Sequence, residues 1–137
     1  MSKVIDKLAW VLIQDGKFLV VRSQGKALFY LPGGKREAGE SDIEALTREI
    51  KEELSVDLIP NSIKYMETFT AQADGKAEGI SVKLTCYFAD YSGDLIPAAE
   101  IEEQRFIDST DESLCSTAAL AVLKWLEKTS LIAGTLA

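Results

Sequence analysis

The sequence predicts one mixed α/β domain, and three observations support this fold class. The chain has 137 residues, about the length of one domain, so we assign residues 1–137 to a single domain. Several short segments are apolar throughout or alternate apolar and polar residues, which is typical of β-strands. Two segments begin with the pattern Ser-x-x-Glu and then place apolar residues at helical spacing, which is typical of α-helices.

The first part of the chain predicts a β-hairpin and a third short strand. Residues 8–13 and 18–21 are apolar, as in strands that are covered on both faces. Between them, Asp15 and Gly16 suit the two positive-φ positions of a type I′ turn, so these strands should pair antiparallel. Residues 28–31 form a third apolar run, which ends at the Pro-Gly-Gly segment that follows it.

An α-helix should follow this glycine segment. Ser41 and Glu44 have the spacing of a capping box, in which each residue satisfies a backbone N–H of the other. The apolar residues that recur at helical spacing after this start are Ile43, Leu46, Ile50 and Leu54.

The second half predicts more strands and a closing helix. Residues 63–69 and 80–88 should form strands, the second of them half-buried because its apolar and polar residues alternate. We expect a turn at 92–93, an acidic loop over 97–104 and a short final strand over 105–107.

The closing helix should begin at a second capping box, formed by Ser109 and Glu112. The C-terminal tail, residues 130–137, is small and apolar and receives no assignment. The predicted apolar face of the closing helix consists of Leu114, Ala118, Ala121, Val122 and Trp125.

The composition excludes several classes of partner and of catalysis. The formal net charge is −7, and because an acidic surface repels phosphate backbones, we expect no nucleic acid and no anionic membrane as partner. The chain has no histidine, which excludes Ser-His-Asp and Cys-His mechanisms, His-ligated zinc and imidazole acid-base catalysis. Any catalysis must therefore use carboxylates, lysine, tyrosine, backbone amides or a hard metal ion.

The cysteines and the apolar runs suggest a cytoplasmic location. Cys86 and Cys115 are too few for a disulfide scaffold or a four-thiolate metal site, and they suit a reducing cytosol. The apolar run at 8–13 is too short for a signal-peptide core or a membrane span.

Three carboxylates of the predicted helix share one side of it. Glu49, Glu52 and Glu53 fall within an arc of about 100°, at the edge of the apolar stripe. Their mutual repulsion grows near the core, and the one neighbouring guanidinium, that of Arg48, cannot neutralise three carboxylates. A divalent cation can, and carboxylate ligands favour Mg²⁺ or Mn²⁺ over zinc or copper. The alternative is that this is a solvated helix face.

The glycines before this helix favour the metal site over the solvated face. Gly33 and Gly34 lack a Cβ, so the backbone can approach a ligand closely and point carbonyl groups into a site. The helix N-terminus beside them favours anions such as phosphate.

The spacing of Gly34, Glu40 and the run over residues 48–56 resembles the Nudix box of the Nudix hydrolases. This resemblance implies an α/β/α sandwich with a mixed β-sheet between helices. It also implies metal-dependent hydrolysis of a nucleoside diphosphate linked to another moiety. Ser55 stands where the family has a glycine that ends the helix, a change that should cost about 1 kcal/mol or shift the turn.

The resemblance also implies roles for individual residues. Glu49, Glu52 and Glu53 become metal ligands together with the Gly33 carbonyl, and Arg48 pairs with Glu40 to orient the helix. The proton of the attacking water goes to Glu49 or to a glutamate of the late loop. Of the candidates there, Glu100, Glu102 and Glu103, we choose Glu100 for its spacing to Phe106. Candidates for substrate contacts are Arg22, which precedes the glycine loop, and Tyr30 and Gly34.

The most favoured function is hydrolysis of a small nucleotide, with nucleoside triphosphates preferred because the chain is compact, as in MutT-like housecleaning enzymes. The first alternative is an ADP-ribose or nucleotide-sugar pyrophosphatase. Two alternatives from other classes are a non-catalytic nucleotide sensor and a protein-interaction domain. The resemblance is compatible with a homodimer.

Overall fold

A mixed four-stranded sheet in the order β4-β1-β7-β6 forms the centre of the fold, in a computed structural model that describes residues 3–73 and 75–132. Strands β1 and β7 are parallel, and the other pairs of this sheet are antiparallel. Three strands form a second sheet, β2-β3-β9, and two short strands pair as β5-β8. The strands are β1 (Lys3–Val11), β2 (Ile13–Gln14), β3 (Lys17–Ser23), β4 (Gly33–Gly34), β5 (Asp57–Leu58), β6 (Lys64–Gln72), β7 (Ile80–Phe88), β8 (Tyr91–Ser92) and β9 (Ile101–Ile107).

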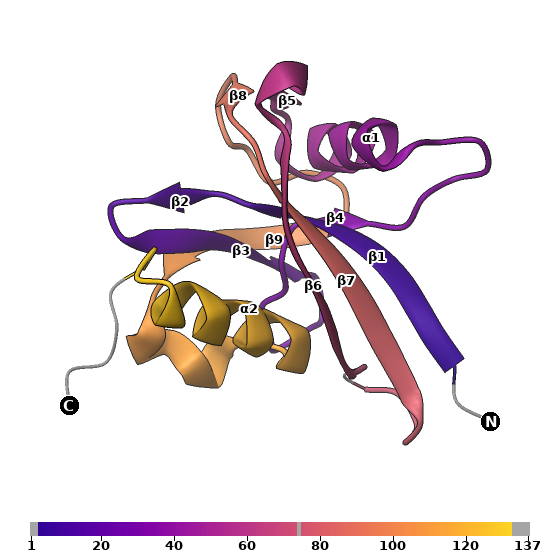
Figure 1. The fold of residues 1–137 in the computed structure, drawn as a ribbon, viewed down its shortest axis with the longest axis vertical. Coiled ribbons are helices and arrows are strands. Elements are labelled where there is room, and N and C mark those ends of the chain that lie inside the picture. Colours follow the sequence, from indigo (N-terminus) through magenta and orange to yellow (C-terminus); the bar gives the residue numbers. More distant parts are fainter. Residues whose placement is uncertain (1–2, 74, 133–137) are drawn as a thin grey trace.

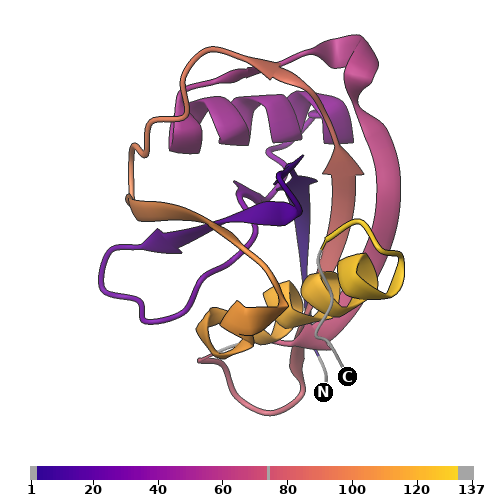
Figure 2. The same cartoon turned by 90° about the vertical axis from the view of Figure 1, so that its left-hand side faces the viewer.

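Two α-helices cover opposite sides of the strands, as Figures 1 and 2 show. They are α1 (Asp42–Leu54) and α2 (Thr117–Lys128), and two short 3₁₀ helices, η1 (Pro60–Ser62) and η2 (Ser109–Leu114), complete the chain. The expected α/β/α sandwich with a mixed β-sheet between helices is therefore confirmed. None of the helices in the described part of the chain is long and apolar enough to span a membrane.

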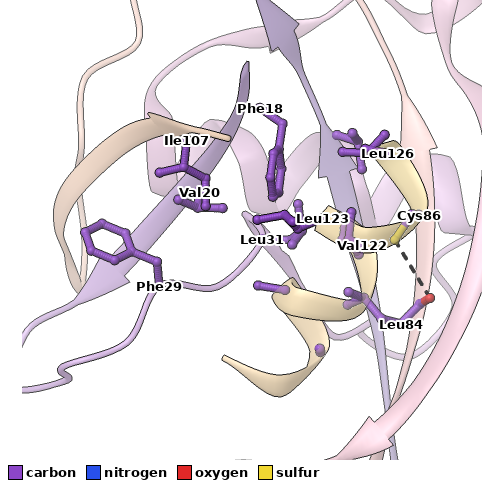
Figure 3. Packing of buried hydrophobic residues seen from close by; sticks show 14 of the residues in the cluster. Phe18, Val20, Phe29, Leu31, Leu84, Cys86, Ile107, Val122, Leu123 and Leu126 are labelled. Atoms are coloured by element: carbon purple, nitrogen blue, oxygen red, sulfur yellow. Dashed lines mark hydrogen bonds between the residues drawn. The ribbon is translucent and has the colours of Figure 1, made fainter. Parts of the chain in front are cut away.

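Strand β1 contributes to two hydrophobic clusters, one beneath each helix. Leu8 and Trp10 pack with the apolar face of α1, whereas Ala9 and Val11 pack with that of α2. Figure 3 shows the cluster on the α2 side, where Phe18 lies among side chains of α2 and the neighbouring strands. Because successive strand residues face opposite sides, a strand buried on both faces must be apolar throughout, as the sequence indicated.

The predicted hairpin forms at its turn but is shorter than expected, because residues 8–11 pair with β4 and β7 rather than with β3. Asp15 and Gly16 have φ values of 53° and 75°, as a type I′ turn requires, and Ile13 pairs antiparallel with Phe18 across it. The run at 28–31 makes isolated bridges, including one from Tyr30 to Val21, in place of a regular strand.

Helix α1 has the predicted start and, except at Ile43, the predicted apolar face. Ser41 accepts a hydrogen bond from the Glu44 N–H, and the Glu44 carboxylate accepts one from Ser41, so the capping box is confirmed. Ile43, predicted to be buried, is 45% exposed, whereas Glu53 is only 7% exposed. Leu46, Ile50 and Leu54 are buried as predicted, and the Glu53 carboxylate is buried beside them.

The structure corrects two boundaries near the C-terminus. Strand β9 begins at Ile101, so half of the predicted acidic loop pairs with β3. The capping box predicted at Ser109 and Glu112 is wrong: Asp108 and Asp111 form one that starts η2. The chain is extended at Cys115, and Ser116 then caps α2.

This later start changes the apolar face of the closing helix. Of the residues predicted for that face, Ala118 and Val122 are buried, whereas Ala121 and Trp125 are only half-buried and Leu114 belongs to η2. Of the tail, Ile132 packs into the α2 cluster, and residues 133–137 lie outside the described residues. The buried residues of α2 are Ala118, Ala119, Val122, Leu123 and Leu126.

Candidate active site

A cleft of about 470 Å³ lies between the glycine strand β4, one side of α1 and the loop before β9. It gathers three carboxylates, those of Glu49, Glu53 and Glu100, and four lysines. The strands supply apolar walls, and Tyr30 adds an aromatic ring. The lysines are Lys7, Lys26, Lys35 and Lys76.

Glu53 is the most buried ionisable group of the cleft. One carboxylate oxygen accepts a hydrogen bond of 3.0 Å from the Gly33 N–H. The pKa of Glu53 is raised from 4.5 to about 8, mainly by burial and to a smaller extent by the negative charges of Glu49 and Glu100, against the opposing effects of the Gly33 hydrogen bond and Lys7. In the absence of a cation, this carboxyl group therefore holds a proton at neutral pH.

The two glycines of β4 allow the helix and the strands to approach closely. A Cβ on Gly34 would lie 2.5 Å from the carboxylate carbon of Glu49, and one on Gly33 would lie 2.1 Å from the Leu8 carbonyl oxygen. Gly33 also has a φ of +144°, which favours glycine. Gly34 must therefore lack a side chain for Glu49 to keep its place in the cleft, and Gly33 must lack one for β4 to approach β1.

Arg48 fixes the outer face of α1 through several acceptors. Its guanidinium donates to both carboxylate oxygens of Glu40, at 2.7 and 2.9 Å, and to Glu49 at 3.1 Å. It also donates to the Lys35 carbonyl at 3.1 Å, which connects the helix to the glycine loop. Arg48 holds the pKa of Glu40 down at about 2. The expected Arg48–Glu40 pair is present, and its role in orienting the helix that carries the carboxylates stays a prediction.

The four residues expected to hold a metal ion do not all reach the cleft. Gly33, Glu49 and Glu53 line it, whereas the Glu52 side chain is 54% exposed and lies 3.3 Å from Arg48. Within residues 3–73 and 75–132, no three acidic or sulfur side chains gather closely enough to hold an ion as they stand. The Gly33 N–H contacts Glu53, and the use of its carbonyl as a ligand stays a prediction.

The cleft residues nevertheless fit a hard divalent cation. Burial raises the pKa of both Glu49 and Glu53. Repulsion adds to this effect, because the Glu49 charge raises the pKa of Glu53 and the Glu52 charge raises the pKa of Glu49. Their oxygen atoms are the ligands that Mg²⁺ and Mn²⁺ prefer. A cation between them would remove the repulsion that the protein alone leaves in place, with Glu52 joining them if it leaves Arg48.

Glu100 alone among the late glutamates lies at the cleft. Its charge raises the pKa of both Glu49 and Glu53, so it faces the same space. Glu102 and Glu103 instead contact Arg22, each at 3.1 Å. The geometry thus favours Glu100 over its two neighbours as an additional base, and the role itself stays a prediction.

The candidate substrate residues divide between the two faces of β3. Tyr30 and Gly34 line the cleft with Val21 and Ser23, but Arg22 is not among its lining residues. Because strand residues alternate in direction, Arg22 points to the opposite face, where it lies over the Phe29 ring and pairs with glutamates of β9.

Sequence reasoning did not identify the lysines of the cleft as site residues, and Lys7 was missed altogether. Burial and the Lys35 ammonium lower the pKa of Lys7, while Glu53 and Glu49 partly offset this effect. Lys26 also lines the cleft and is exposed to solvent. The available signal was the position of Lys7, which directly precedes the apolar run that begins at Leu8.

The protein is therefore an α/β/α sandwich in which carboxylates of α1 face the glycines of β4 across a cleft. The chain belongs to the NUDIX domain family, whose model matches residues 7–128. It is 31% identical over 101 residues to an ADP-ribose pyrophosphatase of Methanocaldococcus jannaschii, a match that covers 72% of this chain and 58% of that relative. The chain therefore spans less than two thirds of the length of that curated relative.

Solved structures show the same fold at low identity. A NUDIX hydrolase from Nitrosomonas europaea superimposes with a TM-score of 0.71 at 20% identity, covering 90% of this chain and 87% of that one. A MutT NUDIX hydrolase from Burkholderia pseudomallei gives 0.68 at 21% identity, covering 89% and 96%. Both similarities support the fold and the order of its elements.

Proposed function

We propose that this protein hydrolyses the pyrophosphate linkage of a small nucleotide with the help of Mg²⁺ or Mn²⁺. The observation that carries the proposal is the placement of two carboxylates beside the glycines of β4, the half-buried Glu49 and the buried Glu53. The same cleft also holds four lysines. Carboxylates alone would repel a polyphosphate, so the arrangement becomes useful when a cation stands between them and the substrate.

In the proposed mechanism, Glu49, Glu53 and the Gly33 carbonyl would hold the metal, and Glu52 would join them if its side chain left Arg48. The metal would neutralise charge on the phosphate oxygens and lower the pKa of a bound water. Arg48 keeps the helix, and therefore both carboxylates, against the glycine strand. Lys7 and Lys35 face the same space and are placed to bind phosphate oxygens.

A carboxylate must accept the proton of the attacking water, because the chain has no histidine. Glu49 and Glu100 are the candidates that line the cleft besides Glu53. Glu100 lies in an exposed turn before β9 rather than on α1, so its carboxylate is available as a base that the helix does not supply.

The preferred substrates are nucleoside triphosphates, because four lysines in one cleft suit a chain of phosphates. The name of the Methanocaldococcus relative supports the second candidate, ADP-ribose or a nucleotide sugar. A non-catalytic nucleotide sensor is less favoured, because Glu49, Glu52 and Glu53 are all retained. We place the activity in the cytoplasm, where the two free thiols stay reduced, and a homodimer is compatible with it.

The test is a screen of nucleoside triphosphates, ADP-ribose, nucleotide sugars and dinucleotides for release of phosphate, pyrophosphate or nucleoside monophosphate. Each substrate is incubated with Mg²⁺, with Mn²⁺ and with EDTA, for the wild type and for Glu53→Gln. We expect turnover that requires the metal and is lost in the variant. Binding of a nucleotide without any turnover would favour the sensor instead.

A further inference from the structure

A second hollow, of about 360 Å³, adjoins the catalytic cleft at the N-terminal end of β1. Ile5, Lys35 and Lys76 line both spaces, so the two are continuous. Lys3 contributes a third ammonium group to the second hollow. The remaining residues that line it are Val4, Asp6 and Ile80.

The charge of this hollow is opposite to that of the whole chain. Asp6 is the one acidic side chain among its lining residues, and it lies 3.3 Å from the Arg36 guanidinium. Among the described residues, the lysines that form ion pairs are Lys51 and Lys124, so the ammonium groups of the hollow are not neutralised there. In a chain with net charge −7, this concentration of positive charge needs a reason.

The backbone of β1 adds hydrogen-bond donors to the same place. β4 pairs with β1 only at Leu8 and Ala9, so the edge of β1 that faces away from β7 is open before these residues (Figure 1). The Trp10 N–H points to that edge, where it donates to the Pro32 carbonyl. Because N–H directions alternate along a strand, those of Val4 and Asp6 point to the same edge, beyond the end of β4.

We infer that this hollow is a phosphate subsite that works without metal, for a phosphate group of the substrate beyond the linkage held at the carboxylates. Lys3 and Lys76, with Lys35 between the two spaces, provide positive charge, and the N–H groups at the strand edge provide directed donors. The ligand is a nucleotide with a further phosphate, or a phosphate chain long enough to extend from the cleft. Its assignment as substrate rests on the proposed function, whereas anion binding by the hollow does not.

The test follows backbone amide resonances of ¹⁵N-labelled protein during titration with inorganic pyrophosphate in EDTA. Without metal, Glu49 and Glu53 do not attract the anion, so a response reports the lysines. We expect the amides of Val4, Asp6 and Ile80 to shift with one dissociation constant. The double variant Lys3→Ala/Lys76→Ala should bind roughly tenfold more weakly, because it removes two of three ammonium groups.

The matched control is Lys17→Ala/Lys64→Ala, which removes two exposed lysines at the other end of the strands. It should bind pyrophosphate as the wild type does. An equal loss in both double variants, or no shift at Val4 and Asp6, would overturn the subsite. Neither result depends on turnover, so the proposed hydrolysis stands or falls separately.

Continuity with the cleft is tested with ATP in the same metal-free buffer. We expect ATP to shift the amides of Tyr30 and Gly33 in the cleft together with those of Val4 and Asp6 in the hollow. ATP that shifts only the cleft amides would contradict the assignment of the hollow to the substrate.

Discussion

Replacing Glu53 by Gln should make the metal-free protein more stable at alkaline pH. The folded state raises the pKa of this carboxyl from 4.5 to about 8, mainly because the group is buried. Between these two pH values the folded state binds a proton that the unfolded state has released, so stability falls as pH rises toward 8. The pKa shift corresponds to a loss of about 5 kcal/mol in the free energy of unfolding. Because the site can relax and admit water when Glu53 ionises, we expect a measured loss of about 2–5 kcal/mol.

Glutamine has nearly the same shape and stays neutral throughout this range. Its side-chain oxygen can still accept the hydrogen bond from Gly33, so the variant removes only the cost of ionisation. The assay is urea unfolding in EDTA at pH 5 and pH 9, for the wild type and for Glu53→Gln. We expect similar free energies of unfolding at pH 5 and a more stable variant at pH 9.

The comparison between the two proteins is essential because other groups also titrate in this range. Glu78→Gln, at an exposed glutamate, is the matched control and should follow the wild type at both pH values. A constant difference between Glu53→Gln and the wild type from pH 5 to pH 9 would refute the reasoning, since it would mean that Glu53 is ionised in the folded protein throughout.

Four more predictions follow from the site. Gly34→Ala should lower turnover at least about a hundredfold with unchanged circular dichroism, because its Cβ displaces the Glu49 carboxylate. Gly39→Ala should keep full turnover, because its Cβ meets nothing within 4 Å, although the φ of +83° should cost about 1 kcal/mol of stability. Arg48→Lys should lower the free energy of unfolding by about 1–3 kcal/mol in urea titrations, because lysine cannot contact Glu40 through two parallel bonds; equal stability would contradict this. Glu100→Gln should lower kcat at least about tenfold, and Glu102→Gln should leave it within about twofold; the reverse order would exclude Glu100 as the base. Ser55→Gly should change the free energy of unfolding by less than about 1 kcal/mol. Glycine relieves the strain of the left-handed φ of 68°, but it also removes the hydrogen bond that the Ser55 hydroxyl donates to the Ile96 carbonyl. A larger loss of stability would show that this hydrogen bond dominates.

The elements that local chemistry determines could be predicted from the sequence. The Asp15-Gly16 turn and the Ser41 cap need only their own side chains and backbone, and both form as expected. Ser55 also keeps the left-handed conformation expected at the helix end, so the substitution did not shift the turn. The start of α2 was misplaced because Cys115 forms a bridge with Phe29, a distant residue, which keeps Cys115 extended and separates η2 from the helix that Ser116 caps.

The candidate site was predictable as a set of carboxylates but not as a cleft. The helical spacing of Glu49 and Glu53 placed them on one face, and they do lie together. The same spacing predicted that Glu52 would lie with them, but the Glu52 side chain points outward and pairs with Arg48. Helical spacing alone does not show such a side-chain contact. The lysines come from segments far apart in the chain, so their gathering around the cleft depends on the pairing of β1 with β4 and β7.

Binding of Mn²⁺, followed by its electron paramagnetic resonance signal, tests most directly whether the carboxylates of the cleft form the metal site. The wild type should bind Mn²⁺ more tightly as pH rises from 6 to 8, because Glu53 must lose its proton to become a ligand. Glu53→Gln should bind at least about tenfold more weakly at pH 8, with little dependence on pH, whereas Glu78→Gln should match the wild type. Equal affinity and equal pH dependence in the wild type and Glu53→Gln would contradict a metal site at these carboxylates.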